Sequence, residues 1–158
     1  MQVFRVLLVA FCAVALSAAT QPGASPEGRW LTQRKHGIIE IYRCGGDGTL
    51  CGRLVWFTVE AGEPNPNPEG FDRHNPDPAR RNRPLCGLVF MTGFKPAGDN
   101  SWENGVLYDP ETGKTYRGNL SMQADGTLRL RGYIAVPLLG ETNVWTRHTG
   151  AVPPCPSK

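Results

Sequence analysis

Two neighbouring segments alternate between apolar and polar residues, and this period-two pattern restricts the fold more than any other feature. In the first segment one face carries Tyr116, Gly118, Leu120 and Met122, and the other carries Thr115, Arg117, Asn119 and Ser121. In the second segment one face carries Leu128, Leu130, Gly132 and Ile134, and the other carries Arg129, Arg131 and Tyr133. Such alternation is typical of antiparallel strands that bury one face. Glycine on both buried faces favours a strongly bent sheet, as at the corner of a barrel.

Turn residues divide the rest of the chain into short segments, and no segment after residue 19 keeps a 3.6-residue apolar period. The predicted strands are Gly28–Leu31, Gly37–Cys44, Leu50–Val59, Gly87–Phe94, Gly105–Tyr108, Lys114–Met122, Thr127–Ala135 and Asn143–His148. Eight hairpin-connected strands favour an all-β fold, an antiparallel up-and-down barrel without open edges. This domain would span 28–149, followed by a C-terminal tail, 150–158. A two-sheet sandwich is the alternative.

The N-terminal segment has the layout of a secretory signal peptide. One cationic residue, Arg5, precedes an apolar run of 11 residues, 6–16, and small residues follow up to Ala19. A membrane-spanning helix would need about 20 apolar residues. We therefore predict a signal peptide at 1–19, a flexible stretch at 20–27 and no membrane span. Removal of Arg5 lowers the formal charge from +3 to +2. Nucleic-acid binding normally needs a cluster of basic residues on one face, and the sequence shows no such cluster, so we predict no nucleic-acid partner.

Four cysteines follow the predicted cleavage site, and an oxidising compartment permits them to form disulfides. If Asp47-Gly48 forms a two-residue hairpin turn, Cys44 and Cys51 face each other at a spacing that a disulfide accepts. Cys86 and Cys155 then either pair, or Cys86 stays buried and free. The spacings contain no Cys-x-x-Cys unit, and we expect no metal or other cofactor.

Trp30 and Arg147 lie on the first and last predicted strands, which are neighbours in a closed barrel. Arg147 could then lie over the indole of Trp30, a cation–π contact of about 0.5 to 2 kcal/mol. The arrangement resembles the signature of lipocalins, and its role would be structural. The alternative is that Trp30 is an ordinary core residue and Arg147 is solvated.

A polar segment, 60–84, contains six prolines and a short possible helix within 77–82. We interpret it as a long ordered loop, and loops of this length are often functional. Its candidate lid residues are Asp72, His74, Asn75 and Asp77. They either face a ligand or fasten the loop through turns and salt bridges. Their oxygens could also bind Ca²⁺, although the spacing matches no calcium loop.

A barrel of this size is either filled by side chains or holds one small ligand. The candidate lining residues are Leu54, Trp56, Phe90, Tyr116, Leu120, Leu128 and Leu130. The alternative for each is a place in the core. The three histidines are scattered and no nucleophile motif is present, so we predict no enzyme.

Several longer motifs point to a family. They are Gly28-x-Trp-Leu, Ile-Glu-Ile-Tyr-x-Cys44, Leu50-Cys-Gly-Arg-Leu-Val-Trp, Asn75-Pro-Asp-Pro, Arg83-Pro-Leu-Cys-Gly-Leu, Trp102-Glu-Asn-Gly-Val-Leu-Tyr-Asp-Pro-Glu-Thr-Gly-Lys-Thr-Tyr116, Leu128-Arg-Leu-Arg-Gly-Tyr-Ile and Trp145-Thr-Arg. Together these motifs resemble the exported bacterial family catalogued as domain-of-unknown-function family 2147. The resemblance implies a lipocalin-like barrel in the bacterial envelope, periplasmic or secreted, and no established activity or site residues.

Two functional hypotheses follow. In the first, the barrel binds a small apolar or amphipathic ligand, because a mostly apolar pocket with a few polar groups is typical of such sites. In the second, the barrel is filled and acts as a structural or interaction protein of the cell envelope. The sequence leaves the oligomeric state open.

Overall fold

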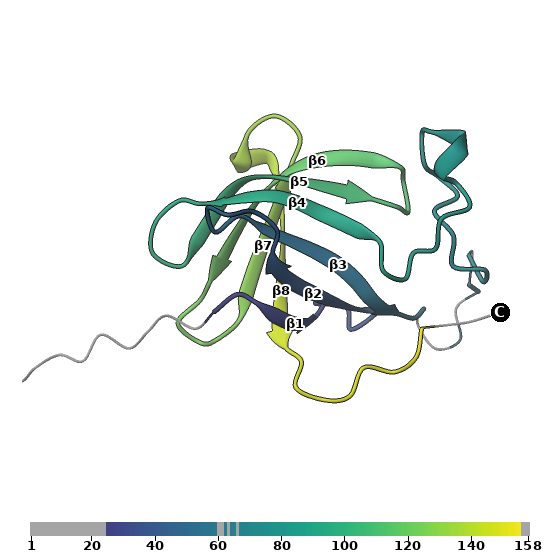
Figure 1. The fold of residues 1–158 in the computed structure, drawn as a ribbon, viewed down its shortest axis with the longest axis horizontal. Coiled ribbons are helices and arrows are strands. Elements are labelled where there is room, and N and C mark those ends of the chain that lie inside the picture. Colours follow the sequence, from purple (N-terminus) through teal and green to yellow (C-terminus); the bar gives the residue numbers. More distant parts are fainter. Residues whose placement is uncertain (1–24, 60–61, 63, 66, 156–158) are drawn as a thin grey trace, which may run out of the picture.

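A computed structural model describes residues 25–59, 62, 64–65 and 67–155, and the predicted signal peptide at 1–19 lies outside this part. The described residues form one closed antiparallel barrel in which each strand pairs with the next and the last pairs with the first (Figure 1). The strands are β1 (Gly28–Leu31), β2 (Gly37–Arg43), β3 (Leu50–Phe57), β4 (Val89–Pro96), β5 (Ser101–Asp109), β6 (Lys114–Met122), β7 (Leu128–Tyr133) and β8 (Glu141–Arg147). The up-and-down barrel is confirmed, and the two-sheet sandwich is wrong.

The strand boundaries differ most from the prediction at β5, which begins at Ser101 and not at Gly105. The register shifts between Trp102 and Gly105, where Asn104 has a positive φ of 59°. This irregularity interrupts the alternation of apolar and polar residues, so the sequence pattern does not indicate the first half of the strand. Two short 3₁₀ helices lie in loops. The first, η1 (Pro78–Arg80), falls inside the predicted helical range, and the second, η2 (Pro137–Leu139), was not predicted.

The seam between β1 and β8 closes the barrel, and its register pairs Trp30 with Arg147 and Leu31 with Thr146. The guanidinium carbon of Arg147 lies 3.9 Å from the centre of the Trp30 ring, which is the contact that the sequence predicts. Trp30 is fully buried, and its indole N–H donates to the Pro26 carbonyl at 2.8 Å. Burial lowers the pKa of the Arg147 guanidinium.

Residues 25–27 belong to this closed end of the barrel. Arg147 donates from its two terminal nitrogens to the carbonyl oxygens of Glu27 and Ser25, and Glu27 forms a 2.6 Å ion pair with Arg43 of β2. The last three residues of the predicted flexible stretch, 20–27, are thus held against the barrel, because the Arg147 guanidinium binds backbone carbonyls there. The remainder of that stretch lies outside the described residues.

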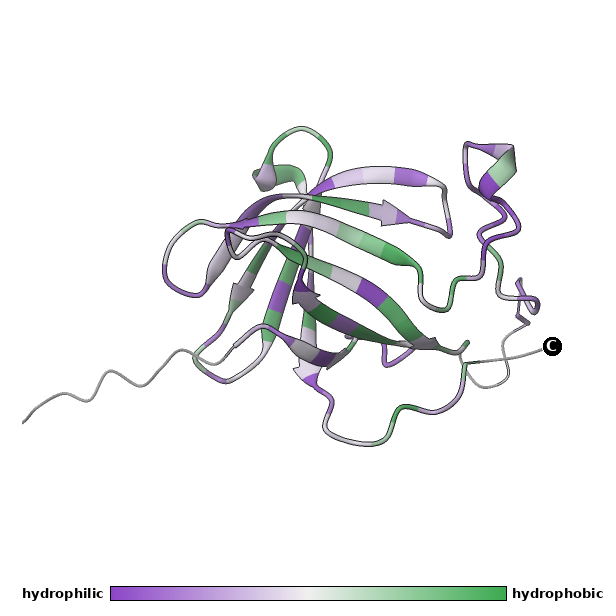
Figure 2. Ribbon diagram, in the orientation of Figure 1, coloured by the Kyte–Doolittle hydropathy of each residue, from purple (hydrophilic) through white to green (hydrophobic). Residues whose placement is uncertain are grey.

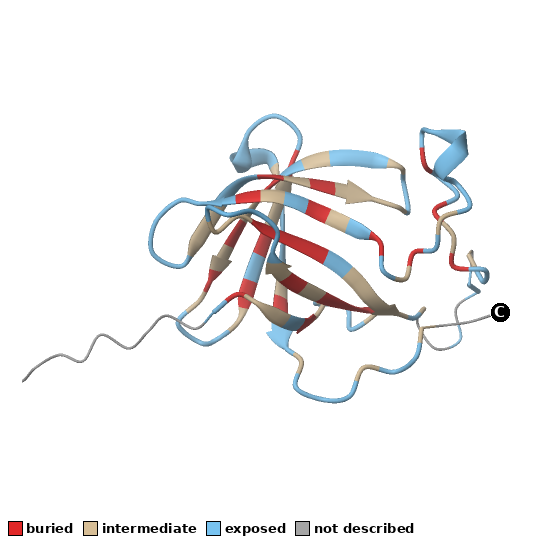
Figure 3. Cartoon of the chain, in the orientation of Figure 1, coloured by how far each residue is buried: buried red, intermediate tan, exposed pale blue. Residues whose placement is uncertain are grey.

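Side chains fill the closed half of the barrel, and Figure 3 shows buried and exposed positions alternating along most strands. Phe94 is fully buried at its centre and packs against two glycines on neighbouring strands. A Cβ atom would lie 2.4 Å from the Phe94 ring at Gly105, and 2.9 Å from it at Gly118. These interior glycines therefore make room for an aromatic ring. The core cluster consists of Trp30, Ile39, Ile41, Leu50, Met91, Phe94, Leu107, Leu120, Met122, Leu128, Leu130 and Trp145.

Trp56 and Ile134, which were both expected on the interior face, do not lie there. A bulge between Ile38 and Ile39 inserts one extra residue into β3, so Trp56 pairs with Ile38 and leaves the face that Leu54 occupies. One inserted residue moves every following side chain to the opposite face. Beyond the end of β7, Ile134 is 77% exposed, because the strand stops at Tyr133. Tyr133 keeps the expected face, opposite Arg117, but is buried there beside Gly140.

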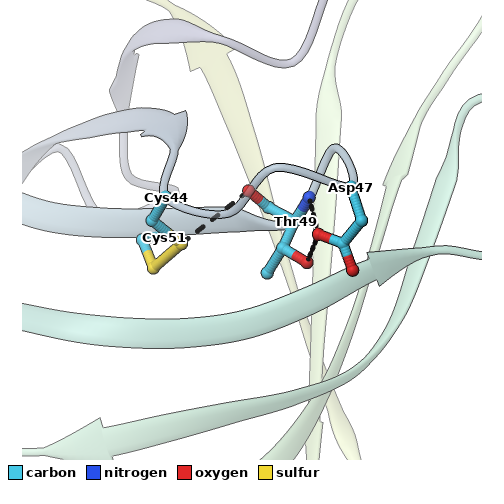
Figure 4. Close-up of a disulfide and its surroundings, with 4 residues drawn as sticks. All are labelled: Cys44, Asp47, Thr49 and Cys51. Carbon is cyan, nitrogen blue, oxygen red and sulfur yellow. Dashed lines mark hydrogen bonds between the residues drawn. A yellow bond between two sulfur atoms is a disulfide. The ribbon is translucent and has the colours of Figure 1, made fainter.

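Two disulfides connect the four described cysteines. Cys44 and Cys51 are joined with Cα atoms 5.7 Å apart, but they do not face each other as predicted. The amide of Cys44 donates to the Thr49 carbonyl, and Cys51 faces Tyr42, so the hairpin has a four-residue loop and the disulfide runs diagonally. Figure 4 shows Asp47, inside this loop, accepting hydrogen bonds from the amide and the hydroxyl of Thr49, and these hydrogen bonds lower the pKa of Asp47.

The second disulfide joins Cys86, just before β4, to Cys155 in the C-terminal segment, with Cα atoms 6.3 Å apart. After β8 this segment runs back along the barrel below β1 and β2 (Figure 1). The sulfur atoms of Cys86 and Cys155 lie 3.7 Å and 3.2 Å from the Val55 carbonyl oxygen, at the bulge in β3. The disulfide therefore connects the tail to the end of the barrel opposite Trp30.

We expect the two disulfides to differ in their contribution to stability. Removing the Cys86–Cys155 pair, which closes 69 residues, should lower the free energy of unfolding by about 4 kcal/mol. Removing the Cys44–Cys51 pair, which closes seven, should lower it by about 2 kcal/mol. Chemical denaturation of the two paired Cys→Ala variants measures both values, and equal losses would contradict the expectation.

Candidate ligand-binding site

The half of the barrel away from Trp30 is not filled, and a cavity of about 740 Å³ lies there. Its floor is built from inward-facing side chains of β2, β3, β4, β7 and β8 and from the segment that leads into β4. These apolar residues are Ile39, Leu54, Leu88, Phe90, Leu130 and Trp145. Figure 2 shows the corresponding alternation of hydrophobic positions along the strands. The floor side chains are aliphatic or aromatic, and the indole N–H of Trp145 is the polar group among them.

The rim of the cavity is polar and comes from three connections that share this end of the barrel. The β1–β2 turn contributes Arg34 and His36, and the β5–β6 hairpin contributes Asp109 and Glu111. The long loop after β3 contributes Pro64, Asn65, Asn67, Arg73 and His74. Arg73 also forms an ion pair with Glu69 within the loop. Both signs of charge are present, so the rim does not select strongly for a cationic or an anionic molecule.

The predicted lining residues divide into three groups. Leu54, Phe90 and Leu130 line the cavity. Leu120 and Leu128 are fully buried in the filled half, and Tyr116 packs against the core, so none of these three lines it. Trp56 is excluded from the lining because the β3 bulge turns it to the other face.

The sequence reasoning missed Ile39 and Trp145, which were assigned only to strands and motifs. Trp145 shares the face of Arg147 two residues later, so the same alternation could have placed it inside. Phe57 also lines the cavity, and only the bulge brings it there.

The long loop is fastened to the barrel wall through Asp72. The Asp72 side chain is 0% exposed and accepts hydrogen bonds from Tyr108 of β5 at 2.6 Å and from Asn75 at 2.7 Å. Arg83, at the far end of the loop, forms an ion pair with the same carboxylate at 2.7 Å. The guanidinium of Arg83 also lies 5.3 Å from the centre of the Tyr108 ring. A buried carboxylate is stable only with such compensation.

The other loop candidates support the same anchoring. Asp77 caps η1 by accepting from the Ala79 amide at 3.0 Å, and its own amide donates to the side chain of Asn75 at 2.9 Å. The His74 side chain is exposed at the rim, while its carbonyl lies against Gly113 of the β5–β6 hairpin, where a Cβ atom would collide with it. Of the four candidates, only His74 borders the cavity. The others hold the loop in place.

Within the described ranges, no three histidine, cysteine or acidic side chains come together as a group that could hold a metal ion. In the same part of the chain, no helix has the length and hydropathy needed to cross a bilayer.

Residues 28–147 match a family described as uncharacterized proteins conserved in bacteria, domain-of-unknown-function family 2147. The match covers the whole barrel, from the first residue of β1 to the last residue of β8. The chain belongs to this family. The resemblance carried by the sequence motifs is thereby confirmed.

A solved structure is similar to this family 2147 member in fold. It is protein HP1028 from Helicobacter pylori, described as belonging to the lipocalin family. The two chains are 24% identical, the TM-score is 0.64, and the match covers 78% of this chain and 82% of that one. This likeness establishes the lipocalin-like fold. Among curated proteins, none matches the sequence.

We expect Tyr108 to report on the attachment of the loop. Burial and the hydrogen bond to Asp72 raise the pKa of Tyr108 above 10.0. A raised pKa stabilises the fold fully below pH 10 and loses that contribution as the pH rises through the value in the folded protein. Asp72→Asn should lower this pKa towards 10.0, in an ultraviolet titration in which Tyr108→Phe identifies the phenol. An unchanged titration would contradict the hydrogen-bonded arrangement.

Proposed function

We propose that this family 2147 protein binds a small apolar or amphipathic molecule in the cavity at the long-loop end of its barrel. The observation that carries the proposal is the contrast between the two halves of the interior. Phe94 and its neighbours fill one half, whereas an open cavity of about 740 Å³ lies between the floor of the other half and the loops of the rim. A volume between roughly 300 and 1,000 Å³ suits a small-molecule site.

The chemistry of the walls supports the same class of ligand. The floor offers apolar contacts from Leu54, Phe90 and Trp145, whose burial against a ligand is favourable in proportion to the area covered. The rim offers imidazole, guanidinium, amide and carboxylate groups that could bind a polar head. An amphipathic molecule would place its apolar part on the floor and its polar part at the rim.

The alternative, a filled structural barrel, lacks this support, because a filled interior would leave no cavity of ligand size. The proposal also contains no catalytic step. His36 and His74 stand on the rim, where they serve as polar contacts for the ligand.

The proposal includes export to the periplasm or the medium. Two disulfides support an oxidising compartment. The signal-peptide layout of residues 1–19 and the bacterial distribution of the family support the same placement.

The test measures binding of a fluorescent polyene fatty acid, cis-parinaric acid, to protein exported with its own N-terminal segment. Leu54→Trp should fill part of the cavity and weaken binding at least tenfold, or about 1.4 kcal/mol. Val89→Trp is the matched control, because Val89 lies on the outer face of β4 next to Phe90 and is 42% exposed. Its affinity should stay unchanged.

Native mass spectrometry of the protein from its own source provides the second arm. A small molecule that is released on denaturation supports the proposal. Empty preparations together with no cis-parinaric acid binding would contradict it, and so would equal affinities for the Leu54→Trp and Val89→Trp variants.

A further inference from the structure

The connection between β7 and β8 exposes a cluster of apolar side chains. Ile134 is 77% exposed, Val136 48%, Leu138 85% and Leu139 78%. Figure 2 shows this connection, at the top of the view, largely in the colour of hydrophobic residues, and Figure 3 shows it as exposed. Single exposed apolar residues are ordinary, but four within six positions mark an interaction surface.

The exposure is built into the fold and does not come from a fraying loop. Arg131 of β7 donates hydrogen bonds to the carbonyls of Pro137 and Leu138, and also to the Thr142 hydroxyl at 2.8 Å. The amide of Gly140 donates to the Pro137 carbonyl at 3.1 Å and closes the turn of η2. Gly140 packs so closely on β7 that a Cβ atom there would lie 2.4 Å from the Gly132 carbonyl. The loop is therefore held with its leucines outward.

Unpaired cations stand on both sides of this loop. On one side, Arg117 of β6 pairs in register with Tyr133, and Lys114 lies at the start of the same strand, which extends past the end of β7. On the other side, the β1–β2 turn with Arg34 and Lys35 adjoins β8, where the Val144 amide donates to the side chain of Gln33 at 2.9 Å.

All four cations are exposed, and none forms an ion pair with any residue that the structure describes. The one acidic residue in the stretch from 127 to 148 is Glu141. On the neighbouring β5, Asp109 lies opposite Lys114 in register, so the four cations outnumber Glu141 and Asp109 around the apolar loop.

We propose that the β7–β8 loop docks the protein onto the surface of an anionic phospholipid bilayer. Leu138 and Leu139 insert at the boundary between headgroups and acyl chains, and the flanking cations contact lipid phosphates. Apolar side chains beside basic ones are the combination that binds such surfaces. Of the residues in the proposal only Arg34 also lies on the cavity rim, and the proposal does not depend on the proposed function.

The size and shape of the patch favour a bilayer over a second copy of the chain. The four side chains expose on the order of 500 Å². A stable protein interface buries about 800 Å² on each partner. The exposed leucines also lie on one protruding turn, which suits insertion into a soft surface. In addition, the flanking cations would repel each other across a symmetric dimer, whereas they attract anionic lipid.

The test measures sedimentation of the exported protein with vesicles of phosphatidylglycerol and phosphatidylethanolamine, and with vesicles of phosphatidylcholine alone. We expect binding to the anionic vesicles that weakens with salt.

The paired Leu138→Ser, Leu139→Ser variant should bind at least tenfold more weakly, because it loses both inserted side chains. Lys114→Gln with Arg117→Gln should reduce binding to anionic vesicles severalfold at low salt and much less at high salt. Val89→Ser is the matched control, since it removes an exposed apolar residue elsewhere on the barrel, and should bind as the native protein does.

Three results would overturn the proposal. One is absence of native protein from the anionic vesicle pellet, and another is unchanged binding by the paired serine variant. The third is a dimer, measured by light scattering, that the paired serine substitution converts to a monomer, because the loop would then bind a second copy of the chain. Since all the substitutions lie on exposed positions, they leave the core intact. Far-ultraviolet circular dichroism of the same variants checks that the barrel is folded.

Discussion

The closure of the sheet between β1 and β8 is the constraint on which the rest of the structure depends. The register at this seam pairs only two residues of each strand, fewer than at the other strand pairs. Arg147 compensates for the short ladder, because it lies over the Trp30 indole and binds two carbonyls of the segment that enters β1. One side chain thus joins the two ends of the barrel sequence and covers one end of its interior. Without closure, both strands would be open edges.

The division of the interior into two halves follows from which side chains point inward. At the closed half, the Phe94 ring lies over the next two strands, β5 and β6, and requires glycine at Gly105 and Gly118. At the other half, the inward residues leave a cavity beneath a long loop. That loop could lie in many positions, but the buried Asp72 carboxylate ties it to Tyr108 on β5, and the Cys86–Cys155 disulfide ties its last residues to the tail. The cavity mouth is therefore a defined structure, although it is built mainly from connections between strands.

The sequence predicted the features that depend on local pattern. Alternation and turn residues located all eight strands, and the positions of Trp30 and Arg147 near the two ends predicted their contact. The errors arose where the backbone departs from the regular strand geometry that the sequence pattern assumes. A one-residue bulge moved Trp56 out of the interior, and a four-residue hairpin offset Cys44 from Cys51. The Asp72 network joins residues up to 36 positions apart, so short-range pattern could name its members but could not choose between a ligand contact and an anchor.

Hydrogen exchange across the seam tests closure by Arg147 most directly. Arg147→Met keeps a side chain of similar length but removes the charge and every donor. The account predicts that amides of β1 and β8, including the His148 amide that donates to the Arg29 carbonyl at 2.9 Å, exchange at least about tenfold faster in this variant. Amides of β4, β5 and β6 should change much less. Native protection at the seam of the Arg147→Met protein, with the Trp30 indole still buried, would contradict the central role of this contact.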